Sequence, residues 1–109
     1  MTTAKATFTV NAGTTVYLSV SFRDQHGNLA VPSSVEYRVD CPNTGQAVRA
    51  VTSVTPAATV EIALSATDNT LLNAGHDTEF RTVTVRGGYG ADDAVVTDFT
   101  YQIRKTRFS

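Results

Sequence analysis

The chain of 109 residues has no tryptophan, a single cysteine and few charges. One cysteine cannot form an intrachain disulfide, on which small secreted β-domains often depend, so we expect a protein that folds in a reducing cytoplasm. The charged share is 17%, below the usual ~25% of globular proteins, and Thr, Ser and Val fill the difference. Thr and Val are β-branched and fit a pleated surface, so the composition favours an all-β fold.

Targeting and membrane-spanning segments are also missing from the pattern. The first residues lack the apolar run of a signal peptide, and no stretch approaches the ~18 apolar residues that span a bilayer. The formal net charge is −1, which argues against nucleic acid as the main partner because phosphate contacts need a basic face. We therefore expect a single domain over residues 1–109, made in the cytoplasm, with neither nucleic acid nor membrane among its partners.

Alternation of apolar and polar side chains runs through most of the chain. It is strict in residues 35–41, where Val35, Tyr37, Val39 and Cys41 share one face, the pattern of a half-buried strand. The same reading predicts about seven strands, at residues 6–10, 14–22, 35–41, 46–54, 59–64, 78–86 and 95–103. These strands, separated by turns, predict an immunoglobulin-like Greek-key β-sandwich of about seven antiparallel strands, although the sequence separates a sandwich poorly from a barrel.

The inward positions of these strands give a predicted core. Its members are Val16, Leu18, Val20, Phe22, Val35, Tyr37, Val39, Val60, Ile62, Leu64, Val83, Val85, Phe99, Tyr101 and Ile103. One aromatic residue does not fit, because Phe80 is out of phase with Val83 and Val85. We therefore expect a bulge or a late strand start near residues 80–81.

The rhythm of two breaks in residues 66–75. Asp68 could cap one helical turn that Gly75 ends. Leu71 and Leu72 would then plug the end of the core, or form an exposed docking pair instead. Such a short crossover is what a Greek-key sandwich needs between its sheets.

Residues for nucleophilic catalysis are sparse. His26 and His76 lie in polar turn segments, and Cys41 ends an apolar strand face, where it reads as a small buried hydrophobe. A nucleophile needs a base within reach, and the sequence pairs neither histidine with Cys41. We expect no enzyme, no catalytic residue and no cofactor.

Two groups of possible metal ligands have a simpler interpretation. Residues 23–28 contain Asp, His and Asn, but these types with Gly are also those of a tight turn. Asp92 and Asp93 could join Asp68 in a calcium site, which would need six or more converging oxygens. We expect a turn and solvated carboxylates, and no metal.

The residues that remain for function are surface groups. Arg104, Lys105 and Arg107 form a basic segment that could pair with carboxylates of a neighbouring subunit, with Phe108 as an apolar anchor. The alternative is a frayed, solvated end. The strand at residues 46–54 carries little charge, so it could be an edge strand that accepts a strand from a neighbour.

The central hairpin resembles part of a known protein family. Residues 37–45, Tyr-Arg-Val-Asp-Cys-Pro-Asn-Thr-Gly, followed by Val48, resemble a pattern in short proteins encoded by tailed-bacteriophage genomes. Residues 67–69, Glu79 and residues 100–105 are similar too, whereas the proline within the hairpin departs from the pattern. The resemblance implies an immunoglobulin-like virion protein that decorates the capsid or belongs to the head-to-tail or tail machinery, surrounded by other virion proteins in a symmetric homo-oligomeric array.

A second hypothesis is a carbohydrate- or cell-surface-binding adhesin domain. Sugar binding in sandwiches usually uses exposed aromatic side chains, and Tyr17 and Tyr89 are the candidates. Together with the basic segment, Tyr89 completes the set of residues expected to make contacts.

Overall fold

The computed structural model describes residues 8–24, 26–73, 75–90 and 94–107. Within these ranges the chain forms seven strands and no helix. The strands are β1 (Thr9–Asn11), β2 (Val16–Ser21), β3 (Ser34–Asp40), β4 (Ala47–Val54), β5 (Thr59–Leu64), β6 (Thr78–Gly88) and β7 (Ala94–Arg104). One sheet has the order β1-β7-β6-β3-β4, and the other pairs β2 with β5.

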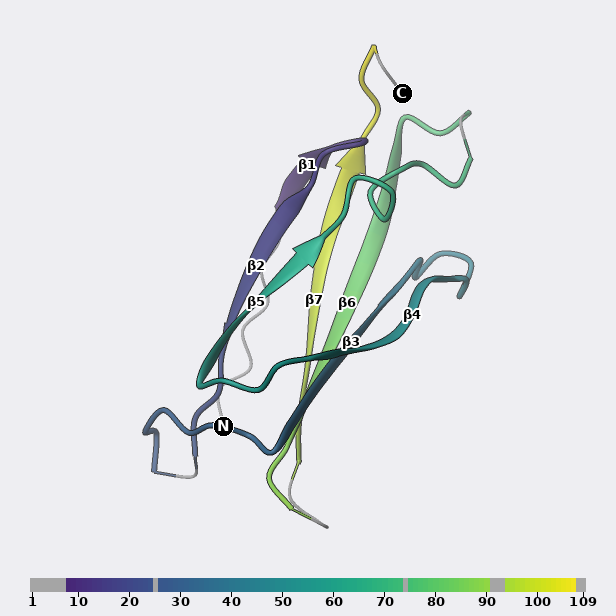
Figure 1. Ribbon diagram of the computed structural model, residues 1–109. Helices are drawn as coiled ribbons and strands as arrows, with labels where there is room; N and C mark the ends of the chain where they lie inside the picture. The colour runs from purple at the N-terminus through teal and green to yellow at the C-terminus, as the bar shows by residue number, and fades with distance from the viewer. Residues whose placement is uncertain (1–7, 25, 74, 91–93, 108–109) are drawn as a thin grey trace.

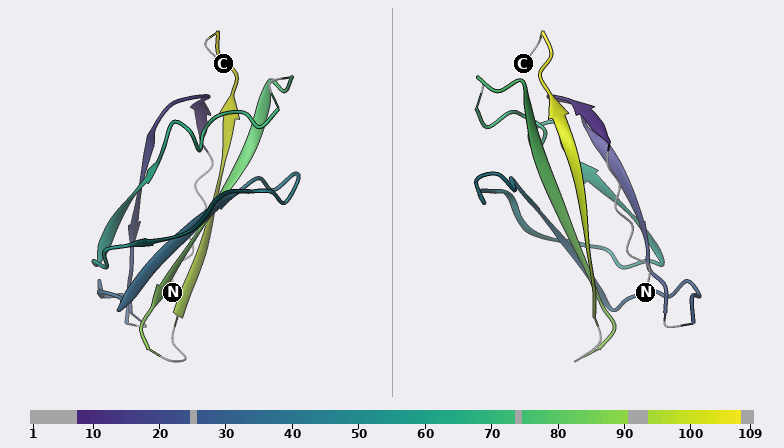
Figure 2. Two further views of the ribbon diagram at one scale, coloured as in Figure 1. Left: turned by 45° about the vertical axis from the view of Figure 1, so that its right-hand side comes forward. Right: turned by 180° about the vertical axis from the view of Figure 1, so that it is seen from behind.

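The two sheets face each other as the layers of an elongated β-sandwich (Figures 1 and 2). Every member of the predicted core is buried except Val16, which is half-buried against the others. The alternation of apolar and polar side chains thus places one face of each strand in the interior. The other face is exposed to solvent, as is common in antiparallel sheets.

The sequence predicts antiparallel strands throughout, but one pair of neighbouring strands is parallel. β1 runs parallel to β7, with Thr9 beside Gln102 and Asn11 beside Arg104. Parallel neighbours need a long connection, and here the whole domain supplies it because β1 and β7 lie at opposite ends of the chain. The local pattern of a strand does not reveal the direction of its partner.

The predicted bulge near Phe80 is wrong. β6 pairs with β7 residue by residue from Thr78 to Gly88 without a register shift. Phe80 points outward and is 40% exposed, whereas Glu79 and Arg81 occupy the inward positions in phase with the buried valines. The strand keeps its period because charged side chains take places that apolar ones were expected to fill.

β4 is an edge strand of the larger sheet, as predicted. Its pairing with β3 shifts register twice, since Tyr37 lies opposite Thr52, Val39 opposite Arg49 and Asp40 opposite Ala47. Each shift adds one residue to β4, which is the signature of a β-bulge. Bulges bend an edge strand and limit its pairing with other strands.

The loop between β2 and β3 is a turn organised by Asp24, as its composition indicated. The Asp24 carboxylate accepts backbone N–H groups of His26 at 2.8 Å and Asn28 at 3.1 Å. Asp and Asn favour such turns because their side chains bond the nearby backbone.

Candidate functional site

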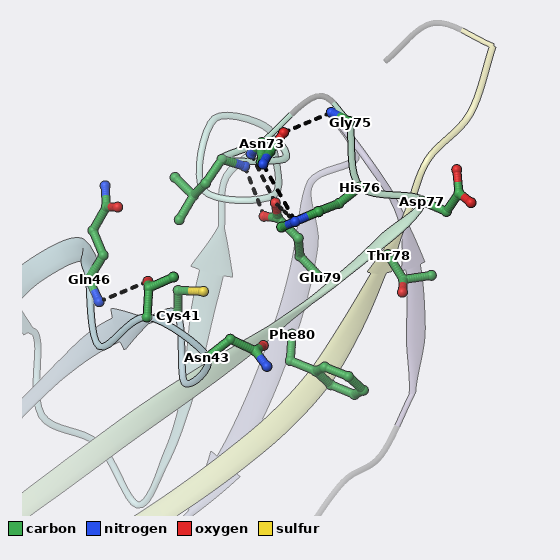
Figure 3. A pocket seen from close by; sticks show the side chains of 12 residues that line it. Cys41, Asn43, Gln46, Asn73, Gly75, His76, Asp77, Thr78, Glu79 and Phe80 are labelled. Atoms are coloured by element: carbon green, nitrogen blue, oxygen red, sulfur yellow. Dashed lines mark hydrogen bonds and ion pairs between the residues drawn. The ribbon is translucent and has the colours of Figure 1, made fainter.

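A cleft of about 680 Å³ opens near the pole of the molecule where β7 ends. Its walls are the β3–β4 hairpin, the crossover from β5 to β6 and the first residues of β6 (Figure 3). Its lining contains the titratable groups Cys41, His76, Asp77 and Glu79.

The crossover begins with a hydrogen-bonded turn and not with a helix. The Ser65 hydroxyl accepts the N–H of Asp68 at 3.2 Å, and the carbonyl of Ser65 accepts the N–H of Asn69 at 3.2 Å. Ser65 therefore caps the turn, and the role predicted for Asp68 is wrong. Leu71 is half-buried against the core, whereas Leu72 is 43% exposed at the cleft, so the two leucines do not act as one plug.

Asp68, which is buried, instead forms an ion pair with the half-buried Arg49 of the edge strand. Arg49 of β4 donates from Nε to the Asp68 carboxylate at 2.7 Å, and its Nη2 reaches the Ser65 hydroxyl at 3.4 Å. Because Asp68 is buried, Arg49 compensates a charge that would otherwise be costly to enclose. Asp92 and Asp93, the other carboxylates of the calcium alternative, lie outside the described residues. No group of three His, Cys, Asp or Glu side chains with metal-binding geometry occurs in the part of the chain that is described.

Glu79 is the carboxylate on which the crossover converges. The N–H groups of Leu72 and Asn73 donate to its two oxygens at 2.8 and 2.9 Å, and His76 Nδ1 lies 3.0 Å away. Arg81 Nη2 donates to it at 3.0 Å. Burial opposes ionisation of Glu79, but these hydrogen bonds favour the carboxylate and lower its pKa to about 2. Glu79 therefore remains an anion at neutral pH.

Arg81 lies behind Glu79 and is completely buried. Its guanidinium donates to the backbone carbonyls of Asp68 at 3.3 Å, Thr70 at 2.8 Å and Phe80 at 2.9 Å, besides the Glu79 carboxylate. A planar guanidinium with five donors suits such a set of acceptors. Arg81 thereby fastens the crossover to β6.

Asn69 and Tyr101 extend this polar cluster across the core. The Asn69 side-chain amide donates to the carbonyls of Thr14 at 2.7 Å and Leu64 at 3.3 Å, which lie at one end of the β2–β5 sheet. The Tyr101 hydroxyl of β7 donates to Asn69 Oδ1 at 2.6 Å. Burial raises the pKa of Tyr101, so the phenol stays protonated and keeps this bond. Asn69 therefore joins the two sheets.

Cys41 lies on the other wall of the cleft and is 3% exposed. Burial raises the pKa of its thiol, but hydrogen bonds from the Thr44 side chain and from the backbone of Thr44 and Asn43 outweigh this and lower it overall. The prediction that Cys41 is a buried residue is confirmed. Its hairpin closes through Gly45, whose N–H donates to the Cys41 carbonyl at 2.8 Å.

The residues expected to make contacts are divided between the two poles of the molecule. Arg104 and Arg107 are exposed near the cleft, and the Lys105 N–H donates to the Asp77 carbonyl at 2.8 Å. Tyr89 lies near the other pole, beyond β6, where its hydroxyl donates to the Ala30 carbonyl at 3.1 Å. It is half-buried and not exposed as expected, because it packs against the core. Phe108 lies outside the described residues.

The sequence analysis missed the buried cluster of Asp68, Asn69, Glu79 and Arg81. A signal was present, because Glu79 and Arg81 are in phase with the inward residues of the same strand. The prediction of a bulge followed Phe80 instead, because this apolar residue is out of phase with the later valines of the strand, and it gave Glu79 and Arg81 no place in the core. Charged residues are almost never fully buried unless paired. Accepting the period would have placed both inside and shown that each needed partners.

Comparisons with known proteins add no relative. The chain matches no family model, and no curated protein or solved structure shows significant similarity to it. Within the described residues, no helix has the length and apolar character to cross a membrane.

Proposed function

We propose that the sandwich is of the immunoglobulin-like, Greek-key type. Strands β7, β6, β3 and β4 are neighbours in one sheet, and β2 and β5 pair in the other. The chain thus passes from β2 to β3–β4, back to β5, and again to β6–β7. This order corresponds to the G-F-C-C′ and B-E strands of immunoglobulin domains. A further strand beside β5, as in larger members of that architecture, is not found in the described part of the chain.

On this fold we infer a structural role in the virion of a tailed bacteriophage, as a capsid decoration protein or a head-to-tail or tail component. The support from the sequence is the hairpin pattern of residues 37–45 and the similar residues after it. The proposed partners are other virion proteins in a symmetric homo-oligomeric array. Its place of action would be the particle, after synthesis in the host cytoplasm.

The observation that carries a contact function is the number of unpaired strand edges. β5 has β2 on one side and no strand on the other among the described residues, and β4 ends the larger sheet. β4 contains one charged residue, Arg49, and the exposed Val51. Unpaired edges with little charge are surfaces that partner proteins use. The edge of β5, which pairs with β2 without a register shift, is the better one for a partner strand, because the bulges of β4 limit its pairing.

The state of the cleft groups supports contact over catalysis. Glu79 is held by four donors with a pKa of about 2, so it is a poor proton donor or acceptor near pH 7. Cys41 is buried, and its thiol is bonded by its own hairpin. Both groups serve the fold.

Mass spectrometry of purified phage particles that encode this chain tests the virion role. We expect the polypeptide in intact particles, with a copy number that matches the symmetry of the capsid or tail. Absence from particles of an expressing phage, or a trace amount unrelated to symmetry, would overturn the proposal. A non-structural protein from the same infected cells serves as the control for contamination.

The adhesin alternative is favoured by one observation. Tyr17 is 64% exposed on the outer face of β2, and exposed aromatic rings are common sugar platforms. A glycan array is the test. Binding that Tyr17→Ala abolishes would favour the adhesin, whereas binding that survives this substitution, or no binding, would remove its structural support.

A further inference from the structure

The cleft is lined by acidic side chains and by no lysine or arginine of the described residues. The two carboxylates belong to Asp77 and Glu79. Glu79 is already bound by Arg81 and by backbone N–H groups. Figure 3 shows Asp77 on the rim, with its carboxylate turned away from Glu79. Asp77 is thus the acidic group that an incoming cation would meet first.

Apolar and amide side chains line the rest of the cleft. Phe80 and Leu72 are 40% and 43% exposed, although both line the cleft, and Asn43 and Gln46 add amide groups from the hairpin. In Figure 3, the Phe80 ring projects from the side of β6, and Asp77 lies just before the first residue of this strand. A guanidinium stacks on aromatic faces, pairs with carboxylates and donates to amide oxygens. Arginine is the side chain that matches all three features.

We propose that this cleft binds Arg107 from a second copy of the chain, an inference that rests on the contact function proposed above. The basic segment Arg104–Lys105–Thr106–Arg107 supplies the complementary charge. Arg107 is exposed, and Figures 1 and 2 show residues 105–107 extending beyond the end of β7. The Lys105 N–H is held by the Asp77 carbonyl, and the chain beyond it extends outward, where Arg107 can reach a neighbour.

The position of donor and acceptor defines the symmetry of the contact. The cleft and the basic segment lie towards the same pole of a molecule with extents of 46 × 20 × 20 Å. Two copies that meet pole to pole around a twofold axis can exchange their segments reciprocally, so that each arginine enters the other cleft. Such an interface is isologous and closes at two subunits.

Sedimentation equilibrium of the isolated chain at a series of concentrations measures the dimer. We expect reversible dimerisation that Asp77→Arg or Arg107→Asp weakens about tenfold or more, because each substitution changes both copies of the contact. The double variant Asp77→Arg/Arg107→Asp reverses both charges and should restore affinity. Phe80→Thr, which introduces the residue type of its outward neighbours Thr78 and Thr82, should also weaken the dimer.

Glu61→Arg is the matched control, since Glu61 is exposed on β5 and its reversal changes the charge as Asp77→Arg does. It should leave the dimer unchanged. A monomer at all concentrations, or a double variant no tighter than the single ones, would overturn the proposal. Urea unfolding of each variant verifies that it is folded. Particle composition is measured separately, so a chain present in virions but monomeric in solution would refute this inference and leave the virion role intact.

Discussion

Arg81 is enclosed completely by protein, and its guanidinium ties β6 to the crossover through the carbonyls of Asp68 and Thr70. It also binds the Phe80 carbonyl and the Glu79 carboxylate of its own strand. Truncation to Ala would leave Glu79 buried without its cation and the carbonyls without a donor. Removing one partner of a buried pair costs about 3–5 kcal/mol. We therefore expect Arg81→Ala to lower the free energy of unfolding by about that amount, measured by urea denaturation.

The control for this prediction is Arg86→Ala on the same strand. Arg86 pairs with Glu36 on the outer face, with side-chain exposures of 60% and 26%. Exposed pairs contribute ~0–1 kcal/mol, so this loss should be small. Equal effects of the two substitutions would contradict a structural role for the buried arginine.

Glu79 makes the free energy of unfolding depend on pH in the acidic range. Its carboxyl group has a pKa of about 2 in the folded protein, against 4.5 as the ordinary value. The unfolded chain therefore binds the proton first as pH falls, so the carboxylate stabilises the fold above pH 4.5 and this contribution is lost between pH 4.5 and 2. The full contribution is about 3 kcal/mol. Glu79→Gln should be less stable than the natural chain at pH 7, with a difference that narrows on acidification.

Urea denaturation of both proteins at several pH values measures this difference. The other carboxyl groups titrate in both chains and cancel in the comparison. A difference that stays constant from pH 7 to pH 3 would show that Glu79 contributes through shape alone.

These two residues also mark the limit of sequence reasoning. The period of two extends to Glu79 and Arg81 and so indicates that they are buried, but nothing local identifies the partners that their burial requires. Most of their partners are backbone groups of the crossover, such as the Thr70 carbonyl and the Leu72 N–H. Backbone groups are the same in every sequence, so they leave no signal of their own. Cys41, by contrast, was placed correctly because its burial follows from the alternation of its own strand.

At the scale of the element, the end of β6 depends on a close approach between the sheets. A Cβ on Gly87 would lie 2.6 Å from Cε1 of Phe22, a ring that is 3% exposed. Overpacking of a core typically costs ~1–3 kcal/mol. We expect Gly87→Ala to destabilise the protein by that amount in urea denaturation.

The next residue provides the matched control. A Cβ on Gly88 would meet Ser34 Oγ at 2.7 Å, but Ser34 is exposed and its hydroxyl can rotate away. Gly88→Ala should therefore cost less than about 1 kcal/mol. A larger effect at Gly88 than at Gly87 would show that β6 does not pack on Phe22 as described.

The elements differ in how far local pattern determined them. β2, β3 and β5 follow from strict alternation, which depends only on neighbours in the chain. The parallel partner of β1 and the bulges of β4 depend on contacts between distant segments. The regular pairing of β6 does too, because its inward Glu79 finds donors and its inward Arg81 finds acceptors in the crossover. Single-strand periodicity cannot contain that information.

At the scale of the whole molecule, Asn69 connects the sheets through polar bonds in addition to apolar packing. Its amide binds one end of the β2–β5 sheet, and its oxygen accepts the hydroxyl of Tyr101 in the larger sheet. Separating the sheets would break these bonds and leave buried polar groups unpaired in both layers. We therefore expect the two sheets to unfold together.

Cys41 offers a measurement of this cooperativity. As the single cysteine, 3% exposed, it should react with a thiol reagent only after the protein opens. If opening is global, the labelling rate rises with urea with the same slope as the equilibrium free energy of unfolding. Gly87→Ala, near the opposite pole, should then accelerate labelling about tenfold for each ~1.4 kcal/mol of stability that it removes. A labelling rate that changes neither with urea nor with Gly87→Ala would show that the β3–β4 hairpin opens alone. The polar cluster would then not hold the two sheets together.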